Sequence, residues 1–257
     1  MAGRQESQPL IEVRALTQLS ELSEAVRLQK IIWGFDDIEI IPLRLFVTAS
    51  KVGGQVFGAF DADRLIGFCL AIPGIKSGGK IYLHSHMLAV LPDYRNAGVG
   101  RVLKLAQRTD ALRRGINLIE WTFDPLEIKN AYFNIERLGA IVRRYVLNQY
   151  GRTSSTLHAG LPTDRCVPEW WLASPRVERI QAGQEKEHVP EAARISVPTD
   201  IEKIKHSDPS RAREIQQRIS DQFLEHFSNG LAVTGFERGP EFASYLFTAD
   251  DKPWDFK

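Results

Sequence analysis

The sequence has few cysteines, little net charge and no long apolar run. Two cysteines among 257 residues, Cys69 and Cys166, are too few for a disulfide framework or a four-thiolate zinc site. The 33 Lys and Arg residues nearly balance the 32 Asp and Glu residues, so the overall charge favours neither a nucleic-acid partner nor a polybasic membrane anchor. No apolar run approaches the ~20 residues that span a bilayer. The polar start, residues 1–9, lacks the apolar stretch of a secretory signal, which predicts a flexible tail and a cytoplasmic location.

What the sequence does contain is typical of a folded α/β protein. Hydrophobic residues make up 43% and charged residues 25%, and a chain of this length can bury a core without disulfides or metals. Hydrophobic periodicity and turn residues predict an order of β, α, α, β, β, β, α, β, α, β up to residue 148. This order, with a hairpin across residues 61–63, predicts a mixed sheet flanked by helices. The expected strands are 10–16, 55–60, 65–72, 80–91, 116–123 and 141–148, and the expected helices are 17–33, 43–51, 101–114 and 125–138.

The remaining residues are less regular. A strand is expected at 167–173, and the Glu-, Lys-, Gln- and Pro-rich stretch 182–200 is expected to be a linker. Asp208 and Pro209 form a good helix start, and apolar residues then recur at helical spacing up to Gly230. Two strands, 231–236 and 242–248, are expected to close the fold as a hairpin. This apolar C-terminal helix and the hairpin are candidates for a homodimer interface.

Gly98 and Gly100 lie between the strand at 80–91 and the next helix. One interpretation is simply a tight strand-to-helix turn. Another is an anion site, because amide N–H groups at a helix start bind phosphate and glycine lets it approach. A dinucleotide-binding loop fits poorly: Glu120 has the right spacing for a ribose-binding acid, but Leu103 occupies the third glycine position. A Walker A loop is excluded because no Gly-Lys-Ser/Thr follows.

A longer segment supports a further interpretation. The stretch Leu-Ala-Val-Leu-Pro-Asp-Tyr-Arg-Asn-Ala-Gly-Val-Gly-Arg, residues 88–101, resembles motif A of the GNAT superfamily of acyl-CoA N-acyltransferases. Arg95, Gly98 and Gly100 fall on the three signature positions of that motif. The element order up to residue 148 is also similar to that of the superfamily, and this resemblance implies a mixed, largely antiparallel central sheet flanked by helices. The resemblance implies a GNAT-like domain at 10–175 and a C-terminal extension, 176–257, packed on the same sheet.

Residues 130–140 resemble motif B of the superfamily, with Ala131 eight residues before Gly139. Ile135 stands where many members have the tyrosine that acts as an acid, and Ala140 stands where they have phenylalanine. The whole chain is similar to a poorly characterised branch with a C-terminal extension. Some members of that branch N-acylate amino acids, including by N-succinylation.

The resemblance implies how acetyl-CoA or another acyl-CoA binds as co-substrate. The pantetheine pairs with backbone groups of the strand, and the pyrophosphate meets amides at the helix start, with arginines adding charge. The strand residues are Leu88, Ala89 and Val90, and the loop residues are Arg95, Asn96, Ala97, Gly98, Val99, Gly100 and Arg101.

Three side chains are candidates for moving the proton of the amine. Strand alternation places His84 and His86 on one face, and Glu120 lies on the neighbouring strand. By the resemblance, His84 lies eleven residues before Arg95, where the histone-modifying branch has its glutamate base. Neutral imidazole is abundant at pH 7 and accepts a proton. The structural alternatives are satisfied core histidines and a Glu120 that pairs with an arginine.

Arg143 and Arg144 are candidates for binding a carboxylate on the acceptor. As neighbours on a strand they are expected to point to opposite faces, and surface charge is the alternative interpretation. The sequence therefore predicts a cytoplasmic enzyme that acylates a small amine, with an amino acid favoured, by direct attack on the thioester. No nucleic acid, membrane or metal is expected. The alternative is a catalytically silent GNAT-like module that binds acyl-CoA.

Overall fold

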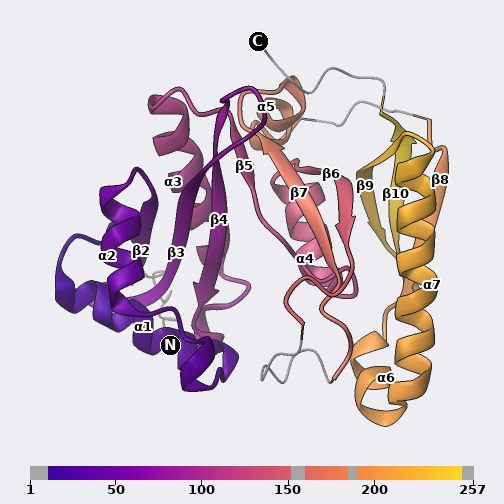
Figure 1. Ribbon diagram of the computed structural model, residues 1–257, viewed down its shortest axis with the longest axis horizontal. Coiled ribbons are helices and arrows are strands. Elements are labelled where there is room, and N and C mark those ends of the chain that lie inside the picture. The colour runs from indigo at the N-terminus through magenta and orange to yellow at the C-terminus, as the bar shows by residue number, and fades with distance from the viewer. Residues whose placement is uncertain (1–10, 152–159, 185–189, 251–257) are drawn as a thin grey trace, which may run out of the picture. The chain divides into compact units, whose positions relative to one another are not determined.

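The computed structural model describes residues 11–151, 160–184 and 190–250, so the predicted tail at 1–9 lies outside the described residues. The chain divides into two compact units, which Figure 1 shows by their labelled elements. The first unit holds residues up to Gly74 and from Ser85 to Arg114. The second holds Ile75–His84 and the chain from Gly115 onward. Strand β4 therefore contributes residues to both units.

The first unit is a sheet packed against three helices. Its strands follow the order β1-β2-β3-β4, and β2 is antiparallel to both β1 and β3. The core contains Phe46, Phe68 and Leu103, which come from a helix, a strand and the helix after β4. The elements are β1 (Ile11–Ala15), α1 (Leu19–Trp33), η1 (Asp37–Glu39), α2 (Leu43–Lys51), β2 (Gln55–Asp61), β3 (Arg64–Ile75), β4 (Ile81–Val90), η2 (Pro92–Tyr94) and α3 (Val99–Arg113).

The second unit has its own sheet and its own core. The strands follow the order β4-β5-β7-β6-β9-β10-β8; β4 and β5 are parallel, and each later neighbouring pair is antiparallel. Phe223 is fully buried, with ring centroids 4.9 Å from Tyr145 and 5.0 Å from Tyr245. The elements are β5 (Leu118–Glu120), α4 (Ile128–Tyr132), η3 (Phe133–Arg137), β6 (Ile141–Val146), β7 (Arg165–Trp171), α5 (Pro175–Gln181), β8 (Ala193–Pro198), α6 (Ile201–Ser207), α7 (Pro209–Ser228), β9 (Leu231–Arg238) and β10 (Phe242–Ala249).

The predicted fold class, a mixed and mostly antiparallel sheet flanked by helices, is confirmed. So are the helix after Asp208, whose carboxylate accepts the N–H of Arg211, and the closing hairpin of β9 and β10. The linker expected at 182–200 is partly wrong, because β8 forms there. Ile195 and Val197 alternate with more exposed residues and pack into the core while β8 pairs with β10, so a short apolar alternation outweighed the polar composition.

The predicted helix at 125–138 is also changed. It begins only at Ile128, because the Asp124 carboxylate accepts the N–H of Leu126 and holds a turn. From Phe133 it continues as a π-helix, in which one extra residue per turn shifts the side chains. The expected strand at 116–123 shortens to β5, and Phe123 makes only an isolated bridge with Cys166.

Candidate functional site

The segment between β4 and α3 has the backbone of an anion site. Gly98 caps the helix with φ +83°, a left-handed conformation that glycine adopts without strain, and Asn96 has φ +64°. The residues Arg95, Asn96, Ala97 and Gly98 are exposed. The first turn of α3 contains no acidic side chain that would offset its positive end. The first N–H groups of α3 therefore lie beside an exposed, conformationally defined loop.

Gly100 is the more informative of the two glycines. Its φ is not positive, and a Cβ added there would meet only the Cδ2 atom of Leu88, at 3.7 Å, which is ordinary contact. Glycine inside a helix costs about 0.5–1 kcal/mol relative to alanine. The surrounding protein gives no steric reason for this glycine. Free space at a helix start fits the close approach of a ligand.

The other predicted cofactor residues lie on both sides of this turn. Ala89 is buried, whereas Leu88 and Val90 are half-buried on the alternate face of β4. The Nε atom of Arg95 lies 3.4 Å from the carbonyl oxygen of Val90, so its side chain folds back toward the strand. Val99 is buried in the core and Arg101 is half-buried at the helix start.

A tyrosine that the sequence reasoning passed over fixes this loop. The hydroxyl of Tyr94 donates to the Oδ2 atom of Asp61, 2.6 Å away, at the end of β2. That hydrogen bond, which is lost if the phenol ionises, raises the pKa of Tyr94. The motif itself contains the tyrosine, but its partner lies 33 residues earlier and has no sequence signal.

The second unit brings two of the predicted catalytic residues together. His84 and Glu120 are directly opposite each other on the parallel strands β4 and β5, and Glu120 is opposite Glu169 on β7. Register partners point to the same face of a sheet, so the three side chains form one row. Sequence reasoning missed Glu169, because nothing in its local pattern shows which strand it faces.

Glu120 is held in ion pairs. Its Oε1 atom lies 2.5 Å from the Nζ of Lys76 and 2.8 Å from an Nη of Arg144, and its side chain is only 4% exposed. Lys76 reaches this position from the turn that follows β3. The structure thus shows the pairing with arginine that the sequence had left as an alternative, and adds a lysine.

Arg143 and Arg144 do not point to opposite faces, and that expectation is wrong. The β6–β7 register shifts between Val142 and Arg144, which is the signature of a β-bulge at Arg143. Both guanidinium groups reach Glu169: Arg143 pairs with its Oε2 atom, and the Nε of Arg144 lies 3.7 Å from its Oε1 atom. A bulge interrupts strict alternation, which explains how consecutive residues contact one carboxylate.

The third predicted catalytic residue, His86, lies at an exposed position of β4, two residues beyond His84. Desolvation by the protein around it lowers the pKa of His86, which favours the neutral imidazole. His86 belongs to the first unit, whereas His84 and Glu120 belong to the second.

A buried lysine was not anticipated. Lys104 on α3 is only 2% exposed, and its Nζ donates to the hydroxyl of Ser85 at 2.8 Å, which in turn donates to the side-chain oxygen of Gln107 at 3.0 Å. Burial lowers the pKa of Lys104 to about 7. Lys104 lies between apolar residues of an amphipathic helix, but this spacing alone does not show that its side chain is buried.

The two thiols and the motif B position lie in the cores. Burial raises the pKa of Cys69 to about 12 and raises the pKa of Cys166 well above its ordinary value, so neither is a reactive thiolate. Ile135, where a tyrosine acid is common, is fully buried. The hydroxyl that the superfamily often uses has no counterpart at this position.

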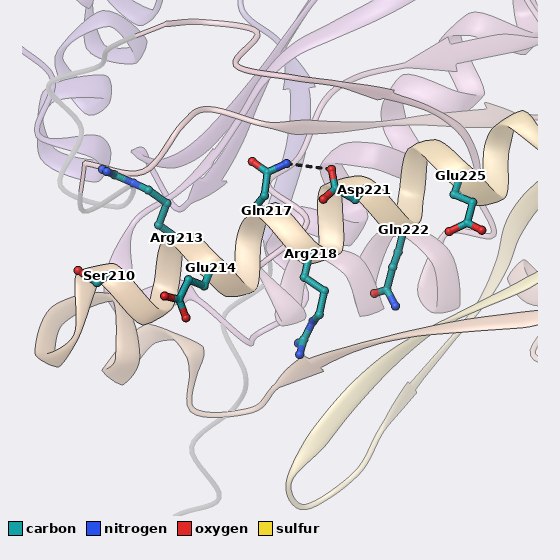
Figure 2. A pocket seen from close by; sticks show the side chains of 8 residues that line it. All are labelled: Ser210, Arg213, Glu214, Gln217, Arg218, Asp221, Gln222 and Glu225. Atoms are coloured by element: carbon teal, nitrogen blue, oxygen red, sulfur yellow. Dashed lines mark hydrogen bonds between the residues drawn. The ribbon is translucent and has the colours of Figure 1, made fainter.

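A shallow hollow of about 760 Å³ lies on α7 and carries no evident chemistry. Figure 2 shows its eight labelled side chains on this one helix, with Gln217 bonded to Asp221 at 2.8 Å. Arginines and carboxylates alternate along it, as on an ordinary solvated face. Within 11–151, 160–184 and 190–250, no three His, Cys, Asp or Glu side chains could together hold a metal. The helices in those ranges also fall short of the length and apolar character that crossing a membrane requires.

Comparison with known proteins shows what this chain is similar to. Residues 22–139 match the profile of the "Acetyltransferase (GNAT) family". A putative GNAT acetyltransferase from Desulfovibrio desulfuricans shares 16% identity and a TM-score of 0.51, covering 63% of this chain and 99% of that one. A putative acetyltransferase from Salmonella typhimurium, solved with acetyl-CoA, shares 13% identity and a TM-score of 0.50, covering 71% of this chain and 99% of that one.

The ribosomal-protein-S18-alanine N-acetyltransferase from Escherichia coli is similar at 16% identity and a TM-score of 0.50, over 64% of this chain and 96% of that one. No curated protein matches the sequence at a significant level. At these identities the solved structures show the shared fold, and the sequence profile shows similarity to the family over residues 22–139. Over residues 22–139, which are less than half of its length, this chain resembles the GNAT family of acetyltransferases.

Proposed function

We propose that this protein is an N-acyltransferase that moves an acetyl or succinyl group from CoA to a small amine, with a free amino acid as acceptor. The GNAT fold implies acyl-CoA-dependent acetyl transfer, and the similar Salmonella protein was solved with acetyl-CoA. The observation that carries the proposal is the start of α3. It combines a left-handed Gly98, an open Gly100 and no acidic residue in the first turn.

The residues of that loop fit the diphosphate of CoA. Backbone amides of residues 96–100 offer donors, whereas the N–H of Arg95 donates to the carbonyl of Pro92, and the positive end of α3 favours anions. Arg95 and Arg101 supply charge beside them, and the backbone of Leu88, Ala89 and Val90 offers partners for an amide-containing chain. When bound, acyl-CoA supplies a thioester, whose acyl carbon bonds to the amine nitrogen as the C–S bond breaks.

The protein must also help the amine lose a proton. An alkyl ammonium with a pKa near 10.4 costs about 4–5 kcal/mol to neutralise at pH 7. His84 and Glu120, opposite each other on β4 and β5, are the proposed proton acceptors, and His86 orients the substrate. Arg143 and Arg144 are the proposed carboxylate ligands of the acceptor.

The remaining organisation is part of the same proposal. A GNAT-like domain spans residues 10–175, and residues 176–257 are an extension of it that supplies β8, β9 and β10. A cytoplasmic location and a homodimer through the C-terminal helix and hairpin stay predictions.

One observation favours a second candidate, a silent module that binds acyl-CoA. The fully buried Ile135 removes the hydroxyl that many relatives use as an acid. This module would need the same loop at α3 but no proton acceptor. Release of free CoA thiol separates the two functions.

The test follows thiol release from acetyl-CoA and succinyl-CoA over the twenty amino acids and their decarboxylated amines. Calorimetry then measures CoA binding to G100A and G100D, with T109D as the matched control that adds the same charge to an exposed position of α3. Loss of one charge-assisted bond predicts roughly 10- to 100-fold weaker binding for G100D. Unchanged CoA affinity in G100D would remove the basis of the proposal, and CoA binding without thiol release would favour the silent module.

A further inference from the structure

Lys104 places a charge where the fold itself has no use for one. Its side chain is among the largest fully buried ones, and the other buried residues of α3 include Val99, Leu103 and Ala111. Removing an ammonium from water costs free energy, and an apolar side chain of similar length at this position would avoid that cost. Features that oppose the stability of a fold are expected at functional sites. Lys104 is therefore better explained by what it does for a ligand than by what it does for the core.

Neutral partners fix the ammonium between α3 and β4. Its Nζ donates to the hydroxyl of Ser85 at 2.8 Å, and that hydroxyl donates to Oε1 of Gln107 at 3.0 Å. Ser85 is 5% exposed and Gln107 is fully buried. Because the proton of Ser85 is given to Gln107, the lone pairs of Ser85 face the lysine and favour its charged form. The ammonium thus has a defined place inside the first unit.

That place is one helical turn from the open glycine of the anion site. Gly100 and Lys104 are four residues apart on α3, so they lie on one face of the helix with about 5–6 Å between their Cβ positions. Side chains of a helix also lean toward its N-terminus, which is the end that the anion approaches. At the effective dielectric constant of about 20 inside proteins, unit charges even about 10 Å apart change each other's binding roughly tenfold. A protonated Lys104 therefore adds to the positive end of α3.

Lys104 titrates near neutral pH, and the titratable groups beside it behave differently. Burial lowers the pKa of Lys104 to about 7. The Sγ atom of Cys69, on β3, lies 4.0 Å from the carbonyl oxygen of Leu103, and burial raises the pKa of this thiol to about 12. On β4, His84 and His86 flank the serine that Lys104 contacts, but strand alternation points them to the opposite face.

The charges along α3 are constant over the same pH range. Arg101, one turn before Lys104, is permanently cationic. Asp110 pairs with Arg113 and Arg114, and hydrogen bonds from Gln55 of β2 and from Arg113 help to hold its pKa below the ordinary value, although burial opposes them. These groups keep their charges from pH 6 to 9, so they do not imitate a titration of Lys104.

We infer that Lys104 is a buried cation of the CoA site, protonated while the diphosphate is bound and returning its proton to the solvent when CoA leaves. The inference rests on the proposed function and deepens it, because it adds a residue and a pH dependence to CoA binding. A bound anion favours the ammonium and so raises the pKa of Lys104. CoA binding then takes up a proton, and CoA affinity falls as the pH rises between the pKa of the free and the bound state.

Calorimetric titration of CoA into wild type, K104M and K51M tests this inference. Each protein is titrated from pH 6 to 9 in pairs of buffers that differ in ionisation enthalpy, so that proton uptake is measured together with affinity. K104M keeps the length of the side chain and removes its charge. K51M is the matched control, because Lys51 of α2 is an exposed lysine of the same unit. The phosphates of CoA titrate in all three proteins, so their contribution cancels.

The expected result changes with pH. At pH 6, K104M should bind CoA about tenfold more weakly than wild type, and at pH 9 about equally well, while K51M matches wild type throughout. A tenfold effect corresponds to a shift of about one pKa unit, so near pH 7.5 wild type should take up roughly half a proton more than K104M per CoA bound. A lysine that only supports the fold would change the affinity by one factor at every pH.

The variant S85A is a second test that leaves the lysine in place. Without the hydroxyl the ammonium loses a hydrogen bond, so the pKa of Lys104 falls further and the loss of CoA affinity should begin at a lower pH than in wild type. This shift decides the matter if K104M fails to fold. A loss of affinity that begins at the wild-type pH in S85A would then overturn the inference.

Two results with K104M would overturn it directly. One is a ratio of wild-type to K104M affinity that stays constant from pH 6 to 9, and the other is equal proton uptake by the two proteins. Absence of CoA binding to wild type would overturn it together with the proposed loop. Thiol release tests the proposed function separately. Without thiol release, a pH-dependent ratio still supports the buried cation; with thiol release and a constant ratio, the function stands and the inference fails.

Discussion

Replacing the buried Lys104 by methionine should stabilise the first unit, and more so as the pH falls. Burial lowers the pKa of Lys104 from 10.5 to about 7. The folded state therefore binds fewer protons than the unfolded state between these values, and its stability rises with pH across that window. The full free-energy cost of burying the charged Lys104 is present below pH 7 and disappears above about pH 10.5.

The magnitude follows from the shift. A difference of roughly 3.5 pKa units at 1.36 kcal/mol each amounts to about 4–5 kcal/mol at low pH. Between pH 9.5 and 7.5 the cost grows by roughly 2–3 kcal/mol. K104M also loses the 2.8 Å hydrogen bond to Ser85, but that loss does not depend on pH. The pH dependence of the difference in unfolding free energy between wild type and K104M therefore reports on the titration of Lys104.

The assay is urea unfolding of wild type and K104M, followed by circular dichroism at pH 7.5, 8.5 and 9.5. If two transitions appear, the comparison uses the one that reports on α3. K51M, at an exposed lysine of α2, controls for removal of a surface charge. Burial raises the pKa of the neighbouring Cys69 from 9.0 to about 12, and because wild type and K104M share this thiol its effect on stability cancels in their difference. A K104M difference that stays constant from pH 7.5 to 9.5 would refute the reasoning.

Three further outcomes follow from particular residues. G100A should raise the free energy of unfolding by about 0.5–1 kcal/mol, because alanine favours a helix over glycine and the added Cβ meets only ordinary contact. The same variant should bind CoA more weakly. A loss of stability would show that the fold needs this glycine. H84A should lower kcat by about 10²-fold with CoA affinity unchanged, as for loss of a general base, and normal turnover would place the base elsewhere. Y245F should lower the unfolding free energy by about 1–2 kcal/mol, because it leaves the buried carbonyl of Pro125 without the hydroxyl 2.6 Å away; an unchanged urea midpoint would contradict this.

Features whose geometry is set by neighbouring residues, such as helix caps and strand alternation, could be predicted from the sequence. Gly98, in a left-handed conformation at the start of α3, depends only on the residues around it, and so does the cap that Asp208 provides for α7. Strand alternation also placed His84 and His86 correctly on β4, because side chains of an extended chain alternate whatever the chain pairs with. The element order up to residue 148 and the fold class follow from the same short-range patterns.

Strand register and burial were decided only by the tertiary structure. No local pattern shows that Glu120 faces Glu169, which lies 49 residues later, or that Lys76 reaches Glu120 from the turn after β3. The bulge at Arg143 arises from pairing with β7, so alternation alone gave the wrong face. The burial of Lys104, and hence its lowered pKa, depends on what packs over α3. The sequence alone determines the helix start at Gly98 and Gly100, because its conformation is local, whereas the charged row needs partners that only folding brings within reach.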